Sequence, residues 1–77
     1  ANLSFAEVEA RVNVNTADAE PIATVLDGVG LRRAEAIVDY RRQNGRFDNL
    51  AEMTEVRGIG ASTVEKNADR IVLREDR

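Results

Sequence analysis

The 77-residue sequence contains no cysteine and no histidine, and it has a single proline. Without cysteine there can be no disulfide and no thiolate metal site, and without histidine the commonest general base and metal ligand is missing. We therefore expect no catalytic site, no metal and no cofactor, although acid–base chemistry by carboxylates alone stays open. A chain of this length fits one domain, which must bury most of its apolar side chains in one core.

Long hydrophobic segments are also missing. No run of about 18 apolar residues occurs, so we expect no membrane-spanning segment. No secretory signal peptide is found either, but the chain begins with Ala1 rather than Met, as a processed or trimmed product would.

The charge balance is acidic. Eleven Lys and Arg residues against 14 Asp and Glu residues give a formal net charge of -3. DNA-binding domains are usually basic, so the net charge argues against a nucleic-acid partner. Contacts to phosphate depend on the local field rather than on the net charge, however, and the distribution of the basic residues therefore matters more.

Periodic apolar positions predict four helices, over about residues 19–26, 31–44, 50–56 and 61–70. Asp18 is the expected N-cap of the first helix, and Gly45 is the expected left-handed cap that ends the second. Asn49 and Glu52 resemble a capping box at the start of the third helix. The side chains expected to face inward from the second helix are Leu31, Ala34, Ile37 and Val38.

The two ends of the chain have weaker patterns. Residues 12–16 alternate between apolar and polar and predict a short extended segment. Residues 1–11 form an N-terminal extension with only a weak helical pattern, and residues 74–77 form a charged tail that is expected to fray. We expect an all-α domain of four to five short helices over residues 12–73, and a monomer. The weak helical pattern in the extension consists of Leu3, Phe5 and Val8.

The second half of the sequence repeats the first at a shift of 30 residues. The segment Leu26-Asp27-Gly28-Val29-Gly30 aligns with Val56-Arg57-Gly58-Ile59-Gly60, and each Gly-apolar-Gly lies between two helical patterns. Repetition at a fixed spacing indicates a duplicated pair of helices. One such pair cannot bury its own apolar face, whereas two pairs packed about a pseudo-twofold axis can.

Each Gly-apolar-Gly predicts a specific backbone geometry. The first glycine lets the chain leave a helix with positive φ, and the apolar residue turns inward. The second glycine leaves the first amides of the next helix uncovered, where they lack intrahelical partners and can bind a phosphate oxygen. Backbone amides do not read base edges, so binding would be independent of sequence. The alternative is a helix–helix turn without a ligand, which demands the same glycines.

Four basic residues within a turn or two of these hairpins favour a local basic patch, although each could simply be a solvated surface residue. Ser62 and Thr63 could donate to phosphate or could cap a helix. The predicted DNA-binding residues are Gly28, Val29, Gly30, Arg32, Arg33, Arg57, Gly58, Ile59, Gly60, Ser62, Thr63 and Lys66.

Other polar and aromatic residues have structural explanations. A second basic cluster consists of Arg41, Arg42 and Arg46. It could extend the DNA footprint, or it could pair with Asp39 and Glu35, which we favour. Tyr40 and Phe47 could stack on bases, but we assign them to the core. Four carboxylates lack EF-hand spacing, and roles at helix N-termini explain them. They are Asp18, Glu20, Asp48 and Glu52.

These residues resemble the helix-hairpin-helix pattern, apolar-x-Gly-apolar-Gly-x-x-x-Ala-x-x-apolar-apolar. The first unit, residues 26–38, fits throughout. The second unit fits in its hairpin, but it has Val64 where Ala is usual and Asn67-Ala68 at the final apolar pair. The resemblance implies a duplicated helix-hairpin-helix domain with a SAM-like fold.

Residues 12–73 are similar to the ComEA-type competence proteins. The similarity is carried by Val-Asn-Val-Asn-Thr-Ala at the start, residues 34–41, Asn44-Gly45-x-Phe47 and residues 57–60. It implies a periplasmic or otherwise extracytoplasmic receptor that binds the phosphate backbone of double-stranded DNA across the minor groove, with DNA-uptake proteins as further partners. Asp27 stands where the family often has proline, and its carboxylate would repel a phosphate by about 1 kcal/mol, so we expect the first hairpin to be the weaker.

Two other functions remain open. An interaction scaffold of the same fold with little DNA affinity would suit the acidic balance and Asp27. An accessory domain of an enzyme such as a glycosylase or ligase would place catalysis outside these residues.

Overall fold

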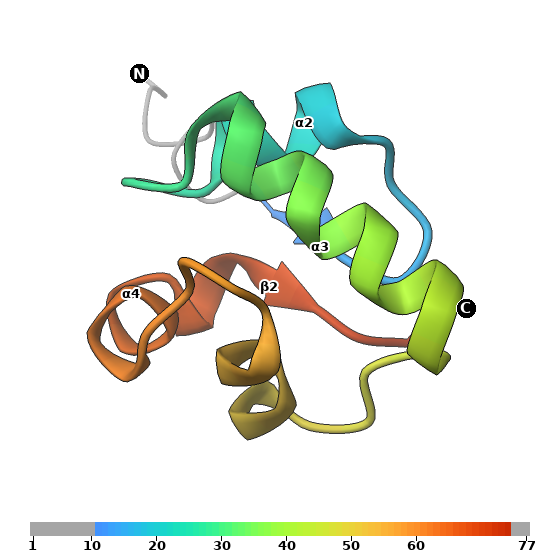
Figure 1. The fold of residues 1–77 in the computed structure, drawn as a ribbon. Coiled ribbons are helices and arrows are strands. Elements are labelled where there is room, and N and C mark those ends of the chain that lie inside the picture. The colour runs from blue at the N-terminus through green and yellow to red at the C-terminus, as the bar shows by residue number, and fades with distance from the viewer. Residues whose placement is uncertain (1–10, 75–77) are drawn as a thin grey trace, which may run out of the picture.

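A computed structural model of the chain describes residues 11–74. Two of the helical segments in this range, Leu50–Glu55 and Ala68–Arg70, are short 3-10 helices. Along the chain the helical segments are α2 (Ala19–Val25), α3 (Gly30–Asn44), η1 (Leu50–Glu55), α4 (Ala61–Lys66) and η2 (Ala68–Arg70) (Figure 1). The expected all-α fold is confirmed. The helical pattern expected in Leu3, Phe5 and Val8 lies outside the described residues.

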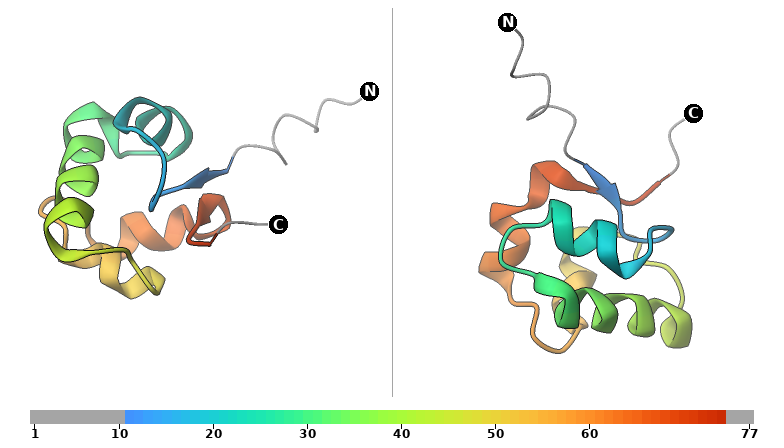
Figure 2. Two further views of the ribbon diagram at one scale, coloured as in Figure 1. Left: turned by 90° about the vertical axis from the view of Figure 1, so that its right-hand side faces the viewer. Right: turned by 90° about the horizontal axis from the view of Figure 1, so that it is seen from above.

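The helices pack as two units that follow the sequence repeat. α2 lies against α3, and η1 lies against α4, so that one pair covers the other (Figures 1 and 2). The strands β1 (Val12–Asn13) and β2 (Ile71–Val72) pair in parallel beside them. This short ladder joins the two ends of the domain.

The core between the two units draws on equivalent positions of the repeat. Leu26 and Val56 are buried, and so are the residues between the glycines, Val29 with an exposed fraction of 2% and Ile59 with 4%. The remaining buried apolar side chains are Val12, Val14, Ile22, Ala34, Ile37, Val38, Phe47, Met53 and Val64.

Helix boundaries agree closely with the expected caps. The N–H of Gly45 donates to the Arg41 carbonyl at 2.9 Å, and Gly45 has φ +94°. The Asn49 Oδ1 accepts from the N–H of Glu52 at 3.0 Å, as in a capping box. The Glu52 carboxylate, however, accepts from the backbone N–H of Asp48 rather than from that of Asn49. Asp18 occupies the N-cap of α2 without a side-chain hydrogen bond.

The expected extended segment over residues 12–16 is wrong after Asn13, where the chain enters a turn. The turn forms because the Asn13 side chain accepts from the N–H of Asn15 at 2.8 Å. The Asn15 side chain in turn donates to the carbonyls of Phe47 and Leu73 at 3.0 and 2.8 Å and accepts from the N–H of Phe47 at 2.7 Å. One amide side chain therefore holds three distant segments together.

The predicted helix over residues 61–70 is wrong as one continuous helix, since it breaks at Asn67. The Asn67 side chain, only 1% exposed, accepts from the N–H of Asp27 at 2.8 Å and donates to the carbonyls of Asp27 and Thr63, each at 2.9 Å. We call these three bonds the Asn67 clamp. They tie the first hairpin to the end of α4, and they explain a polar residue at an otherwise apolar position of the repeat.

The predicted inward position of Leu31 is also wrong, since its side chain is 48% exposed. Val29 already has helical backbone angles and points into the core. Leu31 lies three residues before Ala34 and seven before Val38, which is the spacing of the buried face, but it stands in the first turn of α3 and lines an open pocket. The buried face of α3 is therefore formed by Ala34, Ile37 and Val38 alone.

Replacing Asn67 by alanine should destabilise the domain. The variant leaves the N–H of Asp27 and two carbonyls without their partner in a buried place, so the free energy of unfolding should fall by about 2–3 kcal/mol, measured by urea denaturation. Asn44→Ala is the matched control, because the Asn44 side chain also donates to a carbonyl, that of Tyr40 at 3.0 Å, but is exposed. We expect this control to change stability by less than about 0.5 kcal/mol, and equal losses would contradict the clamp.

Candidate nucleic-acid interface

The two Gly-apolar-Gly segments form similar but unequal bends, hairpin 1 (residues 26–30) and hairpin 2 (residues 56–60). The first glycines, Gly28 and Gly58, have φ values of +80° and +91°, as the sequence predicts. The second glycines differ from each other, since Gly30 has φ +68° but Gly60 has φ -103°. Only Gly60 therefore has a backbone conformation that any residue can adopt.

Gly60 is open to its surroundings as well as unstrained. A Cβ atom built at Gly60 would meet no other atom within 4 Å, and the same holds at Gly30. Folding thus gives no reason for glycine at position 60. A close approach of another molecule to the backbone would give one.

Both hairpins lead into helices that no side chain of residues 11–74 caps. The N-cap residues, Val29 for α3 and Gly60 for α4, make no side-chain cap bond. Within residues 11–74, no side chain accepts from the amides of residues 30–32 or 61–63, and the first bond into α4 runs from Val64 N–H to the Gly60 carbonyl. Each helix therefore begins with unpaired N–H groups at its positive end.

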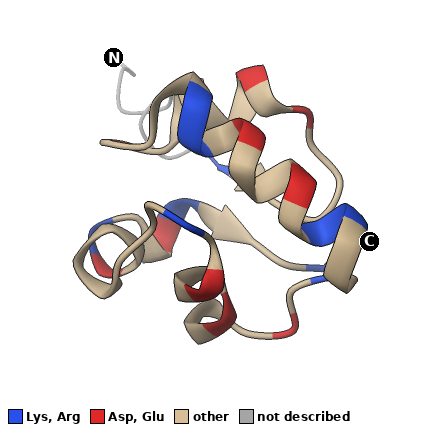
Figure 3. Cartoon of the chain, in the orientation of Figure 1, with Lys and Arg blue, Asp and Glu red and all other residues tan. Residues whose placement is uncertain are grey.

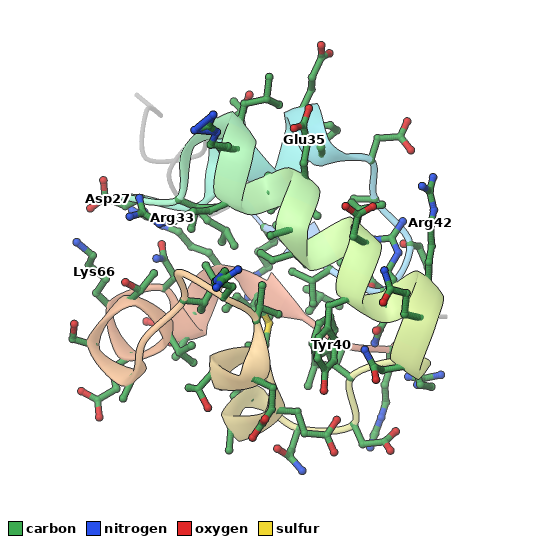
Figure 4. The ribbon with its side chains drawn as sticks, in the orientation of Figure 1. Asp27, Arg33, Glu35, Tyr40, Arg42 and Lys66 are labelled. Carbon is green, nitrogen blue, oxygen red and sulfur yellow. The ribbon has the colours of Figure 1, made fainter. Side chains whose placement is uncertain are left out.

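Basic side chains cross between the two units. The Arg33 side chain of α3 lies over Gly58, with its Nε 3.0 Å from the position of a Cβ there, and Lys66 Nζ of α4 lies 3.3 Å from the equivalent position at Gly28. Figure 4 shows Arg33 and Lys66 on the same edge of the molecule as Asp27. The hairpins therefore share one edge, and each has a cation from the opposite unit against it.

Asp27, the acidic residue of hairpin 1, is opposed by a nearby cation. Lys66 Nζ lies 3.8 Å from its carboxylate, with side chains 52% and 67% exposed for Lys66 and Asp27. An ion pair this exposed contributes little to stability. Its effect is local, because it partly neutralises the charge that we expected to weaken hairpin 1.

The charges are segregated along α3. Basic residues stand at both of its ends and acidic residues between them (Figure 3). At the hairpin end, an open pocket of about 420 Å³ brings together arginines from both units. Its lining consists of Val29, Gly30, Leu31, Arg32, Arg33, Ala36 and Arg57.

The predicted site residues divide into three kinds. Arg32, Arg33 and Arg57 meet at the pocket, whereas Lys66 lies on hairpin 1 rather than on its own hairpin. Val29 and Ile59 are buried and can offer only their backbone. Ser62 is exposed and Thr63 half-buried, and neither is the N-cap of α4, because Gly60 holds that position.

The second basic cluster serves mainly the fold. Arg42 lies 3.9 Å from Asp39, the expected kind of pair. Arg41 instead donates to the Val14 carbonyl at 2.7 Å, and Arg46 donates to the Leu73 carbonyl at 2.8 Å. These two arginines therefore hold the chain ends against α3 and the loop that follows it.

The assignment of Tyr40 and Phe47 to the core is confirmed. The two rings stack with centroids 5.3 Å apart, Phe47 is fully buried, and Tyr40 packs partly buried against the core. Within residues 11–74, no group of three or more Asp, Glu, His or Cys side chains is placed to hold a metal ion. No helix in the same range is long and apolar enough to cross a membrane.

Comparison with known proteins agrees with this architecture. The family model described as helix-hairpin-helix motif matches residues 7–72. A Haemophilus influenzae protein that carries the name "Uncharacterized protein" is 47% identical over 72 residues, which cover 94% of this chain and 64% of the relative. ComE operon protein 1 of Bacillus subtilis is 43% identical over 65 residues, which cover 84% of this chain and 31% of the relative.

A third relative, endonuclease/exonuclease/phosphatase family domain-containing protein 1 of Homo sapiens, is 39% identical over 56 residues, which cover 73% of this chain and 10% of the relative. The chain thus spans less than two thirds of each of these relatives. No solved structure is found to match. From the family match and the two paired-glycine hairpins, the chain belongs to the helix-hairpin-helix motif family, and its domain is of the ComEA type.

Proposed function

We propose that this domain binds double-stranded DNA without sequence preference through its two hairpins, across the minor groove, as a non-enzymatic receptor in extracytoplasmic DNA uptake. The observation that carries the proposal is the pair of uncapped helix N-termini behind open glycines on one edge of the domain. The role in uptake rests on similarity to the ComEA type, with DNA-uptake proteins as further partners.

The hairpins supply the contacts to the strand. A phosphate oxygen that approaches Gly30 or Gly60 meets unpaired amides and no side chain, so it can accept hydrogen bonds directly from the backbone. Ser62 and Thr63 follow Gly60 and can add hydroxyl donors. Such contacts fix the position of a duplex without reading its bases.

The arginines supply the attraction. Arg32, Arg33 and Arg57 line one pocket beside hairpin 1, although the whole chain has a net charge of -3. The acidic residues of α3 follow Arg32 and Arg33 along the helix and lie between its two basic ends (Figure 3). The field at the hairpin edge is therefore more positive than the net charge indicates.

The spacing of the hairpins is fixed by the fold. The Asn67 clamp joins hairpin 1 to the end of α4, and the Arg33 side chain lies across hairpin 2. Two phosphate sites at a fixed separation match a repeating backbone better than two independent sites, because no ordering cost is added on binding.

Binding to random-sequence DNA duplexes should weaken steeply with salt. If Arg32, Arg33 and Arg57 each neutralise one phosphate, the logarithm of the association constant should fall against the logarithm of salt concentration with a slope of about -2.7. Fluorescence anisotropy with labelled duplexes of several sequences measures both the slope and the lack of sequence preference. Absence of binding at low salt, or binding indifferent to salt, would contradict the proposal.

Gly60→Ser separates folding from binding. Serine is a better N-cap than glycine, and its hydroxyl would accept from the amides that we assign to phosphate, so stability should stay equal or rise by a few tenths of a kcal/mol. DNA affinity should fall about tenfold, as for the loss of one hydrogen bond to a charged group. Urea denaturation and anisotropy give the two readouts.

Gly58→Ala is the matched control for that experiment. Its positive φ and its contact with Arg33 predict a loss of stability of about 1–3 kcal/mol. If Gly60→Ser loses stability in the same way, or binds DNA as tightly as the parent, the backbone amides are not the site.

Asp27→Asn should strengthen binding. The change removes a carboxylate beside hairpin 1 and frees Lys66, while the backbone N–H of residue 27 keeps its bond to Asn67. We expect DNA affinity to rise about threefold to fivefold at low salt, since the repulsion is about 1 kcal/mol. Asp39→Asn is the control. Asp39, like Asp27, is exposed and lies near a basic side chain, here that of Arg42, but it is away from the hairpins. An equal gain in both variants would show an effect of net charge alone.

A further inference from the structure

Leu31 is an apolar side chain that the described part of the chain leaves half uncovered. It is 48% exposed and is the one large apolar side chain between residues 11 and 74 that lies exposed. At the equivalent position of the second unit the repeat has Ala61, which is also exposed. The helix-hairpin-helix unit therefore folds without a large side chain at this position.

A single exposed leucine means little alone, but Leu31 lines the pocket beside hairpin 1. The apolar side chains that this pocket exposes are Leu31 and, in part, Ala36. Its polar part is formed by three arginines, Arg32 and Arg33 of α3 and Arg57 of hairpin 2. A ligand that fits must present apolar surface to the leucine and negative charge to the guanidinium groups.

A nucleic-acid strand has this alternation, because each sugar is flanked by two phosphates. An apolar peptide would leave the arginines without partners, and a free anion would leave Leu31 uncovered. The charge of the lining therefore favours a sugar with its neighbouring phosphates as the occupant. Whether that sugar carries a 2′-hydroxyl then matters, because this group lies in the minor groove.

We propose that Leu31 packs against a deoxyribose of the bound strand and makes the domain prefer DNA to RNA. The inference rests on the proposed binding of nucleic acid by the hairpins. A ribose at this place would press its 2′-hydroxyl against the leucine methyl groups, where it loses water and finds no hydrogen-bond partner. Deoxyribose presents only C–H groups there and gains from the apolar contact.

The test compares affinities for a DNA duplex and for an RNA duplex of the same sequence, by anisotropy at one salt concentration. The parent protein should bind DNA more tightly. Leu31→Asn offers the 2′-hydroxyl a partner, so the ratio of DNA to RNA affinity should fall about fivefold, which corresponds to about 1 kcal/mol. The difference in shape between the two duplexes cancels, because the same two probes are used for every variant.

Arg32→Gln is the matched control. Arg32 is the neighbour of Leu31 in the same pocket, but it faces the phosphates that DNA and RNA share. This variant should weaken binding to both duplexes by a similar factor and leave their ratio unchanged. Urea denaturation should show that Leu31→Asn folds with only a small loss of stability, because about half of the leucine side chain is already exposed.

The outcomes separate the two proposals. If the parent binds DNA and Leu31→Asn keeps the parent's ratio, the role of Leu31 is wrong and the hairpin function stands. If the ratio falls as much in Arg32→Gln as in Leu31→Asn, the discrimination does not come from the leucine. If the parent binds neither duplex at low salt, both proposals fail.

Discussion

The rest of this structure depends on the burial of one apolar side chain between two glycines, Val29 in hairpin 1 and Ile59 in hairpin 2. Each pins its bend to the common core, so the helix that follows must start at the surface. The helix then leaves its first amides without intrahelical partners. Stability and the proposed binding site thus come from the same residue, since the side chain points inward and the backbone around it points outward.

Much of the fold could be predicted from the sequence, because periodicity, caps and the 30-residue repeat are local signals. The start of α2, the end of α3 and the Asn49 cap all follow from a few neighbouring residues. The Asn67 clamp does not, since it joins positions 40 residues apart, although a polar residue at an apolar place of the repeat was a signal that could have found it. The prediction for Leu31 was wrong because periodicity gives the face of a helix but not how far the neighbouring elements cover it, and Leu31 stands in the first turn of α3.

The residues of the candidate site also divide into those that local sequence signals predict and those that only the packing of the two units brings together. The glycines, Arg32 and Arg57 are local to the hairpins and were predictable. The contacts of Arg33 with Gly58 and of Lys66 with Gly28 depend on how the units pack, and only the tertiary structure brings them together. The acidic net charge has a related weakness as evidence. A sum over the chain contains no information on position, whereas three arginines meet at the hairpin end of α3 and acidic residues stand between the basic ends of that helix (Figure 3).

The parallel pairing of β1 with β2 gives the domain a mechanical property. In a parallel pair, a force that draws the start of one strand away from the end of the other acts along the strands. All the hydrogen bonds of the ladder then share the load, and none is opened before the others. The bond from Val14 N–H to the Val72 carbonyl is one of them. The Asn15 side chain adds its bond to Leu73 in the same place. A domain tethered through its two ends would therefore resist tension first by shear across this small ladder, while the hairpin edge stays outside the line of force.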